Sequence, residues 1–419
     1  MPQPPVASAA GSSSAAQSPT TAASPKDEGK GKSYAGDFWT LFFNGKSAIA
    51  DAFRKDPKLR PNTPAYVLGR RSEHTEPEHI AQWVNQNVKH VHFFSYRSRF
   101  PEPLEGGLDH DAGWGCMIRT GQMMMCEAVR RVIPNEVVAR ACHLLFRDIK
   151  SAPFGIHRMT EEGAKSHIPV GQWFSPTALA FTAKRLTAQS EVTAPHLAIV
   201  IGMDGAVKRA EISSEFVEGR PVVVMVPIMA GRDKIPQDQQ RAILKTFELP
   251  CSLGIVGGRP KHSLYFVGKQ SDQVFYLDPH TVQPAFVTKE TVGNQSGVRG
   301  TMSVADMDPS MVMCFLLKTN RDLDEWERAF KEVINPLTEY PLFSIVRPKA
   351  PKTAAAPNAA PASAAASPGT TAPASPAAPS APPSAAPAAP DDDVDDCAYD
   401  SDLDEDLSQS PTNVRQESS

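Results

Sequence analysis

The feature that most constrains this chain is a run of small residues that leads directly into an apolar segment. Gly113 and Gly115 flank Trp114, and Cys116 follows. Glycine adopts backbone angles that are closed to other residues and lets another segment approach closely. The apolar run that begins at Met117 is typical of a buried helix. The sequence therefore predicts a tight turn that ends where Cys116 opens a buried helix.

A cysteine at the start of a helix is in a chemically special place. The unpaired backbone N–H groups and the positive end of the helix dipole favour a thiolate, so they lower the pKa of Cys116 and activate it as a nucleophile. The same N–H groups can face a developing oxyanion. The alternative is that Cys116 is only a small packed side chain, because free cysteines are among the most buried residues. Considered alone, this alternative is the commoner one.

Composition divides the chain of 419 residues into three parts. The ends are rich in Ala, Pro and Ser, and the last part also carries an acidic block, so neither can bury enough apolar surface to fold. We therefore predict a disordered segment over 1–33, a folded domain over 34–348 and a disordered tail over 349–419.

Charge and cysteine usage exclude several classes of protein. The formal net charge of −4 comes without a stripe of Lys and Arg, which argues against nucleic-acid binding. The six cysteines are scattered and form no C-x-x-C pair, so neither a disulfide scaffold nor a zinc ribbon is expected. No secretory signal and no apolar run long enough to cross a bilayer are visible. We expect a soluble, cytoplasmic protein.

Hydrophobic periodicity predicts a mixture of helices and strands, which is typical of an α+β fold. The segment 151–169 is expected to be loop, and Ser175 is expected to cap a helix that begins with Pro176. The predicted helices are 80–91, 116–132, 136–148, 176–186, 213–218, 237–247 and 323–334. The predicted strands are 65–69, 196–202, 221–229, 249–257, 263–268, 274–277 and 311–318.

A cysteine nucleophile needs a base, and Asp278-Pro279-His280 can supply one. In an extended segment, residues two positions apart point to the same face, so Asp278 and His280 can address one site. Pro279 fixes its own φ and keeps the preceding residue extended. His280 would deprotonate Cys116, and Asp278 would orient the imidazole. Alone, this tripeptide is most often a turn after a strand. The combination with Cys116 favours a cysteine hydrolase.

Four motifs in the same order resemble the autophagin family, the autophagy cysteine proteases. The similarity runs from Gly69 to Trp326. The motifs are Gly113-Trp114-Gly115-Cys116-Met117-Ile118-Arg119 with Gly121-Gln122-Met123, Gly171-Gln172-Trp173-Phe174, Ser252-Leu253-Gly254-Ile255-Val256-Gly257-Gly258-Arg259-Pro260, and Tyr276-Leu277-Asp278-Pro279-His280-Thr281-Val282-Gln283.

The resemblance implies a papain-like cysteine protease core with a small additional α/β subdomain. It implies an endopeptidase that cuts a ubiquitin-like autophagy modifier after a glycine and also releases the modifier from phosphatidylethanolamine. The partners would be the precursor and the lipid-conjugated form of the modifier, with transient contact to autophagic membranes through the lipidated substrate. We expect a monomer that uses no metal or organic cofactor.

Site residues follow from the same resemblance. Cys116 would be the nucleophile, His280 the base and Asp278 its orienting partner. Tyr96 matches the tyrosine beside the oxyanion, where its O–H and the Cys116 N–H would hold negative charge. The alternative for Tyr96 is an ordinary core residue.

Two further positions match the parts of the family that close over the active site. Trp173 and Pro260 would form two walls that admit only the backbone of a glycine, which makes the specificity steric. The alternatives are a core aromatic residue for Trp173 and a simple turn for Pro260.

The chain also departs from the family pattern. Thr120 stands where many relatives place a second cysteine, which puts redox control through that thiol in question. Phe343 and Val346 have the spacing of a modifier-docking motif, as do Phe38 and Leu41, and such a motif docks as an added strand. Packing within the domain is the alternative for both pairs.

Two other functions remain open from the sequence. One is a catalytically silent protein that binds the modifier and serves as a tether. The other is a thiol amidase or acyltransferase that acts on small molecules, which would turn over small amides without a protein modifier.

Overall fold

The computed structural model describes residues 40–44, 59–259, 262–288, 298 and 300–347. The predicted tails, 1–33 and 349–419, lie outside these residues. Among the described residues, nine strands form one mixed sheet, in which β11, β9, β8, β7, β12, β6 and β4 are neighbours in that order and β1 joins β8 and β2. The strands are β1 (Ala65–Val67), β2 (Arg70–Arg71), β4 (Ala198–Ile201), β6 (Val222–Met229), β7 (Ser252–Arg259), β8 (His262–Gln270), β9 (Gln273–Leu277), β11 (Gly300–Ser303) and β12 (Ser310–Leu317).

The sheet is mostly antiparallel, and its central strands are covered on both faces. Alternate residues of β12 illustrate this, because Val312 and Cys314 belong to one hydrophobic core while Met313 and Phe315 belong to the other. A strand that is buried on both faces reads as a continuous apolar run. The apolar segments 196–202 and 221–229 are therefore confirmed as strands, and β4 and β6 pair in parallel.

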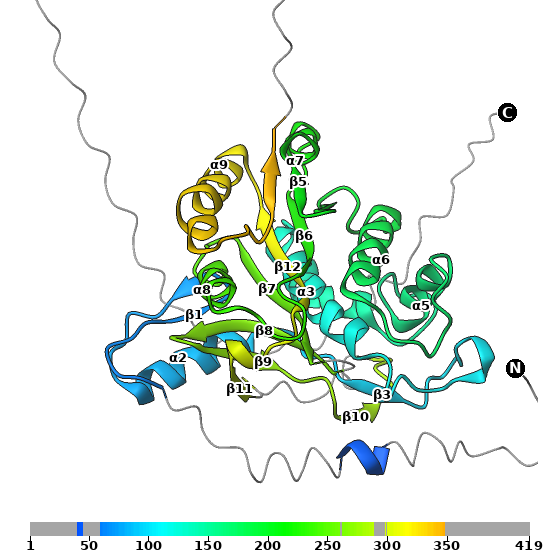
Figure 1. Ribbon diagram of the computed structural model, residues 1–419. Coiled ribbons are helices and arrows are strands. Elements are labelled where there is room, and N and C mark those ends of the chain that lie inside the picture. Colours follow the sequence, from blue (N-terminus) through cyan, green and yellow to red (C-terminus); the bar gives the residue numbers. More distant parts are fainter. Residues whose placement is uncertain (1–39, 45–58, 260–261, 289–297, 299, 348–419) are drawn as a thin grey trace, which may run out of the picture. The chain divides into compact units, whose positions relative to one another are not determined.

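Helices lie on the two sides of the sheet (Figure 1). On one side, α3 (Cys116–Val132) packs against β7 and β8, and α6 (Pro176–Gln189) packs against β4 and β6. On the other side are α8 (Gln237–Thr246) and α9 (Asn320–Ala329). The predicted α+β class is confirmed. Within the described ranges, no helix is both long and apolar enough to cross a membrane.

Local sequence signals locate several helices correctly. The predicted helix 116–132 coincides with α3, and the predicted helix 80–91 corresponds to α2 (Pro77–Lys89). The Ser175 hydroxyl caps α6 by accepting a hydrogen bond of 3.1 Å from the Ala178 N–H. Cap residues act over such short separations, so the sequence alone is sufficient to identify them.

The prediction of loop for 151–169 is wrong, because α5 (Ile156–Ala164) lies within it. The buried side of α5 carries the polar residues His157, Thr160 and Glu162. Glu162 receives an ion pair of 3.0 Å from Arg185 of α6. The helix is only nine residues long, and Ile156 and Met159 are the two large apolar side chains on its buried face, so its helical period is easily missed in the sequence.

The predicted helix 136–148 is also shorter than expected. It consists of α4 (Glu136–Ala141) and the 3₁₀ helix η2 (Cys142–Phe146). The backbone N–H of Asp148 instead donates to the carbonyl of Phe286 over 2.7 Å. A distant segment therefore takes the hydrogen bond that would have continued the helix.

The last described segment packs into the domain. Phe343 is 1% exposed, and its ring centroid lies 4.4 Å from that of Phe330. The strand β13 (Ser344–Val346) pairs in parallel with β5 (Ala206–Lys208). Val346 is 47% exposed. The arrangement favours internal packing for Phe343, and docking through Phe343 and Val346 stays a prediction that requires β13 to leave β5.

Replacement of Phe343 by Ala removes an aromatic side chain from a filled core. We expect the free energy of unfolding to fall by about 3–5 kcal/mol, as is usual for Phe→Ala in a core. Chemical denaturation of the purified protein measures this loss. Val346→Ala is the matched control, and we expect it to change stability little. Equal effects of the two substitutions would contradict the packing described here.

Candidate active site

The turn that precedes α3 is built around the carboxylate of Asp111. The N–H of Gly115 donates to the carbonyl of Asp111 over 2.9 Å. A Cβ atom on Gly115 would lie 2.4 Å from Asp111 Oδ2, so only glycine fits at this position. Cys116 begins α3 and is 2% exposed, as the sequence predicted.

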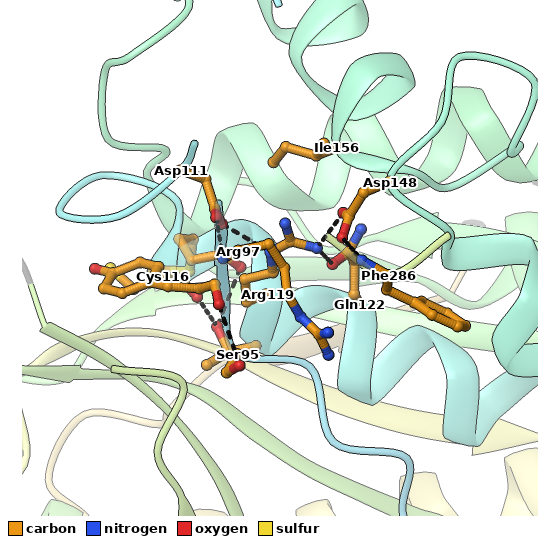
Figure 2. A network of polar contacts seen from close by, with 12 residues as sticks. Ser95, Arg97, Asp111, Cys116, Arg119, Gln122, Asp148, Ile156 and Phe286 are labelled. Atoms are coloured by element: carbon orange, nitrogen blue, oxygen red, sulfur yellow. Dashed lines mark hydrogen bonds and ion pairs between the residues drawn. The ribbon is translucent and has the colours of Figure 1, made fainter. Parts of the chain in front are cut away.

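One arginine on the first turn of α3, Arg119, stabilises the turn that precedes the helix. Arg119 Nε donates to Asp111 Oδ2 over 2.7 Å, and Arg119 Nη1 donates to Asp148 Oδ1 over 2.8 Å. Nη1 also donates to Gln122 Oε1 over 3.1 Å. All three charged side chains are fully buried. Figure 2 shows Arg119 lying between the two carboxylates, on the same helix as Cys116.

The two carboxylates extend this network to other segments. Asp111 Oδ1 accepts a hydrogen bond of 2.6 Å from the N–H of Arg97 in β3 (Tyr96–Ser98). Asp148 Oδ2 accepts one of 2.8 Å from the N–H of Phe286. Phe286 follows β10 (Val282–Pro284), which pairs in parallel with β3. The network thus ties α3 to both strands that flank the site.

The predicted base lies directly after β9, in the expected geometry. His280 Nδ1 and Asp278 Oδ1 are 2.5 Å apart, and the same oxygen accepts a hydrogen bond of 3.0 Å from the His280 N–H. Because Asp278 is hydrogen-bonded to Nδ1 of His280, the other ring nitrogen, Nε2, is the one that can interact with Cys116. The side chains of Cys116 and His280, the predicted nucleophile and the predicted base, interact across 280 − 116 = 164 positions of sequence.

Electrostatics favour an ion pair between these two groups. Burial alone would raise the pKa of the Cys116 thiol, but the hydrogen bond and charge of His280 lower it below its ordinary value. Burial alone would lower the pKa of His280, but Asp278 and Cys116 together raise it to about 9. The pair therefore favours thiolate and imidazolium, which is the reactive form of a cysteine nucleophile.

Tyr96 lies in contact with the same cluster. It packs with Ala112, Cys116 and Val282, and its ring meets the ring of His280 edge-on with centroids 5.2 Å apart. Burial, followed by the charge of Cys116, raises the pKa of Tyr96 far above its ordinary value. The phenol therefore keeps its proton and can donate a hydrogen bond, as an oxyanion partner must.

The sequence reasoning missed His262, which faces the base. The rings of His262 and His280 are stacked, with centroids 3.6 Å apart and planes 3° apart. His262, Asp278 and His280 offer donor atoms within 4.8 Å of one another. This group could hold a metal ion, which would take the base out of use. No local pattern identifies His262, because it reaches the site through the pairing of β8 with β9.

Thr120 and Ser263 were also missed as supporting residues. Their hydroxyl oxygens lie 2.8 Å apart, which connects the first turn of α3 to β8. The Thr120 hydroxyl also donates to the Cys116 carbonyl over 2.9 Å. Thr120, where many relatives carry a cysteine according to the resemblance, therefore has a structural role of its own.

The two predicted gate residues are less closely defined. Trp173 is 42% exposed and lies shortly before α6. Pro260 lies outside the described residues. The roles of both stay predictions.

A short N-terminal helical segment, residues 40–44, covers part of the cluster. The ring of Phe43 meets that of Tyr96 at 5.2 Å. Asn44 and the backbone of Val282 exchange two hydrogen bonds of 3.0 and 2.8 Å. The predicted motif of Phe38 and Leu41 lies partly outside the described residues, and Leu41 is exposed.

Replacement of Arg119 by Met removes the guanidinium that is hydrogen-bonded to both buried carboxylates and leaves them only the charge of the nearby Arg97. We expect the free energy of unfolding to fall by about 3–5 kcal/mol, measured by urea denaturation. Arg71→Met is the control, because Arg71 pairs with Glu73 at the exposed surface and should contribute little. A loss for Arg119→Met no larger than that of the control would contradict the role of this network.

Comparison with known proteins agrees with the geometry. The sequence model of the Peptidase C54 catalytic domain matches residues 81–329. "Probable cysteine protease atg4" of Botryotinia fuckeliana (strain B05.10) is 35% identical over 257 residues, which is 55% of this chain and 57% of that protein. "Cysteine protease ATG4D" of Xenopus laevis is 27% identical over 371 residues, covering 71% of this chain and 78% of that protein.

A third relative, "Cysteine protease ATG4B" of Gallus gallus, is 28% identical over 350 residues, covering 71% of this chain and 88% of that protein. The match to the Botryotinia protein thus spans less than two thirds of its length, whereas the vertebrate proteins are covered more fully. These matches confirm the predicted resemblance and the papain-like α+β class. The chain belongs to the peptidase C54 family, the autophagy cysteine proteases.

Proposed function

We propose that this chain is a cysteine endopeptidase that cuts a ubiquitin-like autophagy modifier after a glycine near its C-terminus. We further propose that it releases the same modifier from phosphatidylethanolamine. The observation that carries the proposal is the meeting of Cys116, at the start of α3, with the His280–Asp278 pair. The similarity to proteins named as autophagy cysteine proteases supports the choice of substrate.

The first chemical step would be attack of the Cys116 thiolate on the carbonyl carbon of the scissile glycine. Negative charge would develop on the carbonyl oxygen. The backbone N–H of Cys116 has no partner inside its own helix and can donate to that oxygen, and the Tyr96 hydroxyl can donate from the other side. The imidazolium of His280 would then give its proton to the leaving amine, which breaks the C–N bond and leaves a thioester.

The second step would be hydrolysis of this thioester. Neutral His280 would take a proton from water, and the resulting hydroxide would attack the thioester carbon and release the Cys116 thiolate. Asp278 keeps its negative charge, because the hydrogen bond and charge of His280 outweigh burial and hold its pKa below the ordinary value. The leaving amine belongs to a peptide in the precursor and to ethanolamine in the lipid conjugate. Both bonds are amides of the same glycine, so one site can serve both reactions.

Selectivity for glycine would arise from steric exclusion. In this proposal Trp173 and Pro260 form the walls of a slot that only a glycine backbone can enter. The exposed indole of Trp173 is compatible with a side chain that moves over an arriving substrate. One added methyl group on the substrate would collide with such walls.

Cleavage of a modifier precursor with a C-terminal extension tests the proposed activity. We expect the full-length protein to remove the extension under reducing conditions, and Cys116→Ala to reduce the rate by more than about 10³-fold. Cys314→Ala is the matched thiol control, since Cys314 is buried in β12 away from the site. An uncut extension, or equal cleavage by Cys116→Ala, would overturn the protease proposal.

Two further substrates refine this experiment. A precursor whose scissile glycine is replaced by alanine should be cut much more slowly if the slot is steric. The modifier coupled to phosphatidylethanolamine in vesicles should be released by the same Cys116-dependent reaction. Turnover of small amides in preference to both protein substrates would instead support the small-molecule amidase.

The pH dependence of cleavage should report the ion pair. Because Asp278 and Cys116 raise the pKa of His280 to about 9, the imidazolium is lost as the pH rises through that value. The stability that this pair contributes is therefore complete below the ordinary histidine pKa of about 6.5 and disappears towards pH 9. We expect kcat/KM to fall on the alkaline side near pH 9.

Asp278→Asn removes the carboxylate that stabilises the imidazolium. We expect the alkaline limb of the kcat/KM profile to move to lower pH, because the pKa of His280 falls when its charge partner is lost. Profiles of wild type and variant on the same precursor make the comparison. An alkaline limb at the same pH in both proteins would show that His280 does not depend on Asp278.

A further inference from the structure

A second group of reactive side chains lies away from the candidate active site. His92 precedes β3, Cys126 lies on α3, and Cys142 begins η2. Their donor atoms all lie within 4.8 Å of one another, and the two Sγ atoms are 3.4 Å apart. Cys126 is 126 − 116 = 10 residues beyond Cys116 on one helix, which corresponds to about 15 Å along its axis. The group is therefore separate from the catalytic thiol.

We propose that His92, Cys126 and Cys142 form a binding site for a thiophilic divalent metal ion, with Zn²⁺ as the ion that fits best. Zinc binds cysteine sulfur at about 2.3 Å and histidine nitrogen at about 2.0 Å. Two sulfur ligands of one tetrahedral zinc ion are therefore about 3.8 Å apart, so the present spacing needs only a small adjustment. Thiolate and imidazole ligands favour zinc over magnesium or calcium, which prefer oxygen.

The charges around the group are compatible with a bound ion. Two thiolates balance one divalent ion, so the buried site would carry no net charge. Arg130 acts electrostatically on both cysteines, and it is already held by Glu127 through two hydrogen bonds of 2.9 Å. Hydrogen bonds from Cys126 and His92 lower the pKa of Cys142, whereas burial raises the pKa of Cys126. Metal binding requires both sulfur atoms as thiolates, so it would release the protons that they carry.

The surroundings also orient the histidine. The rings of His92 and His143 are stacked, with centroids 4.6 Å apart. Ligating histidines in proteins are usually held by outer partners that fix the direction of the ring. The described residues supply three donors, and a water molecule would complete a tetrahedral site. The bound ion would connect α3 to η2 and to the segment before β3.

The competing reaction of this pair is oxidation. A Cys126–Cys142 disulfide would require the sulfur atoms to approach to about 2.05 Å and would consume both thiolate ligands. The presence of His92 in the same group favours the metal site, because a disulfide joins only the two sulfur atoms, whereas a metal ion would also bind the imidazole nitrogen.

Cobalt binding to the full-length protein tests the proposal directly. The parent carries Cys116→Ala and His280→Ala, so that neither the Cys116 thiol nor the group of His262, Asp278 and His280 can contribute, and it is kept reduced with a phosphine. We expect one Co²⁺ per chain, with thiolate-to-cobalt charge-transfer absorption and the visible bands of a tetrahedral ion. Addition of Zn²⁺ should abolish both signals. Cys126→Ser and Cys142→Ser should each weaken binding by at least about 10- to 100-fold.

Cys314→Ser in the same background is the matched control and should bind cobalt as the parent does. His92→Gln provides a variant that keeps both thiols if a cysteine substitution prevents folding. Zinc should raise the melting temperature of the parent and of the Cys314→Ser control, but not that of His92→Gln.

Three results would overturn the proposal. The first is a folded, reduced parent that shows no thiolate–cobalt absorption. The second is unchanged absorption in the Cys126→Ser, Cys142→Ser double variant. The third concerns the parent isolated without reductant. If its mass is two hydrogens lower because of a Cys126–Cys142 disulfide, and it still fails to bind cobalt after reduction, the proposal is wrong.

Discussion

The architecture of the candidate site depends on one buried cation. Arg119 is fully enclosed and faces two carboxylates, Asp111 and Asp148, which are enclosed as well. Removal of such charges from water is costly, and the cost is offset only when the geometry is good and the remaining hydrogen bonds are satisfied. The backbone N–H groups of Arg97 and Phe286 supply bonds of this kind. The network therefore holds α3, β3 and the segment after β10 together, and it fixes the turn that precedes Cys116.

Four of the cysteines that the structure describes show how strongly environment decides chemistry. Cys116 has a lowered pKa because His280 lies beside it, whereas burial in β12 raises the pKa of Cys314. Cys126 and Cys142 share a hydrogen bond and an imidazole. Residue type and spacing along the chain could not distinguish these cases. The contacts that distinguish them come from residues far away in the sequence.

Local signals were sufficient for much of the fold. The glycines around Trp114 and the apolar run after Cys116 predicted the turn and α3, and the predicted base, His280, interacts with Asp278 and Cys116 in the structure. In contrast, α5 is only nine residues long and three of its buried residues are polar, so its helical period was missed. Arg119, His262 and the group around Cys126 also escaped prediction, because each is assembled by long-range packing that no local pattern records.

The order of the segments along the chain has a consequence for synthesis. Asp148 completes its contacts only with the backbone of Phe286, and the base His280 lies a few residues before that point. A chain emerging from the ribosome thus carries its thiol for a long time before it can hold the base and the buried arginine in place. Until His280 has been made and placed, the Cys116 thiol lacks the imidazole that lowers its pKa in the finished domain.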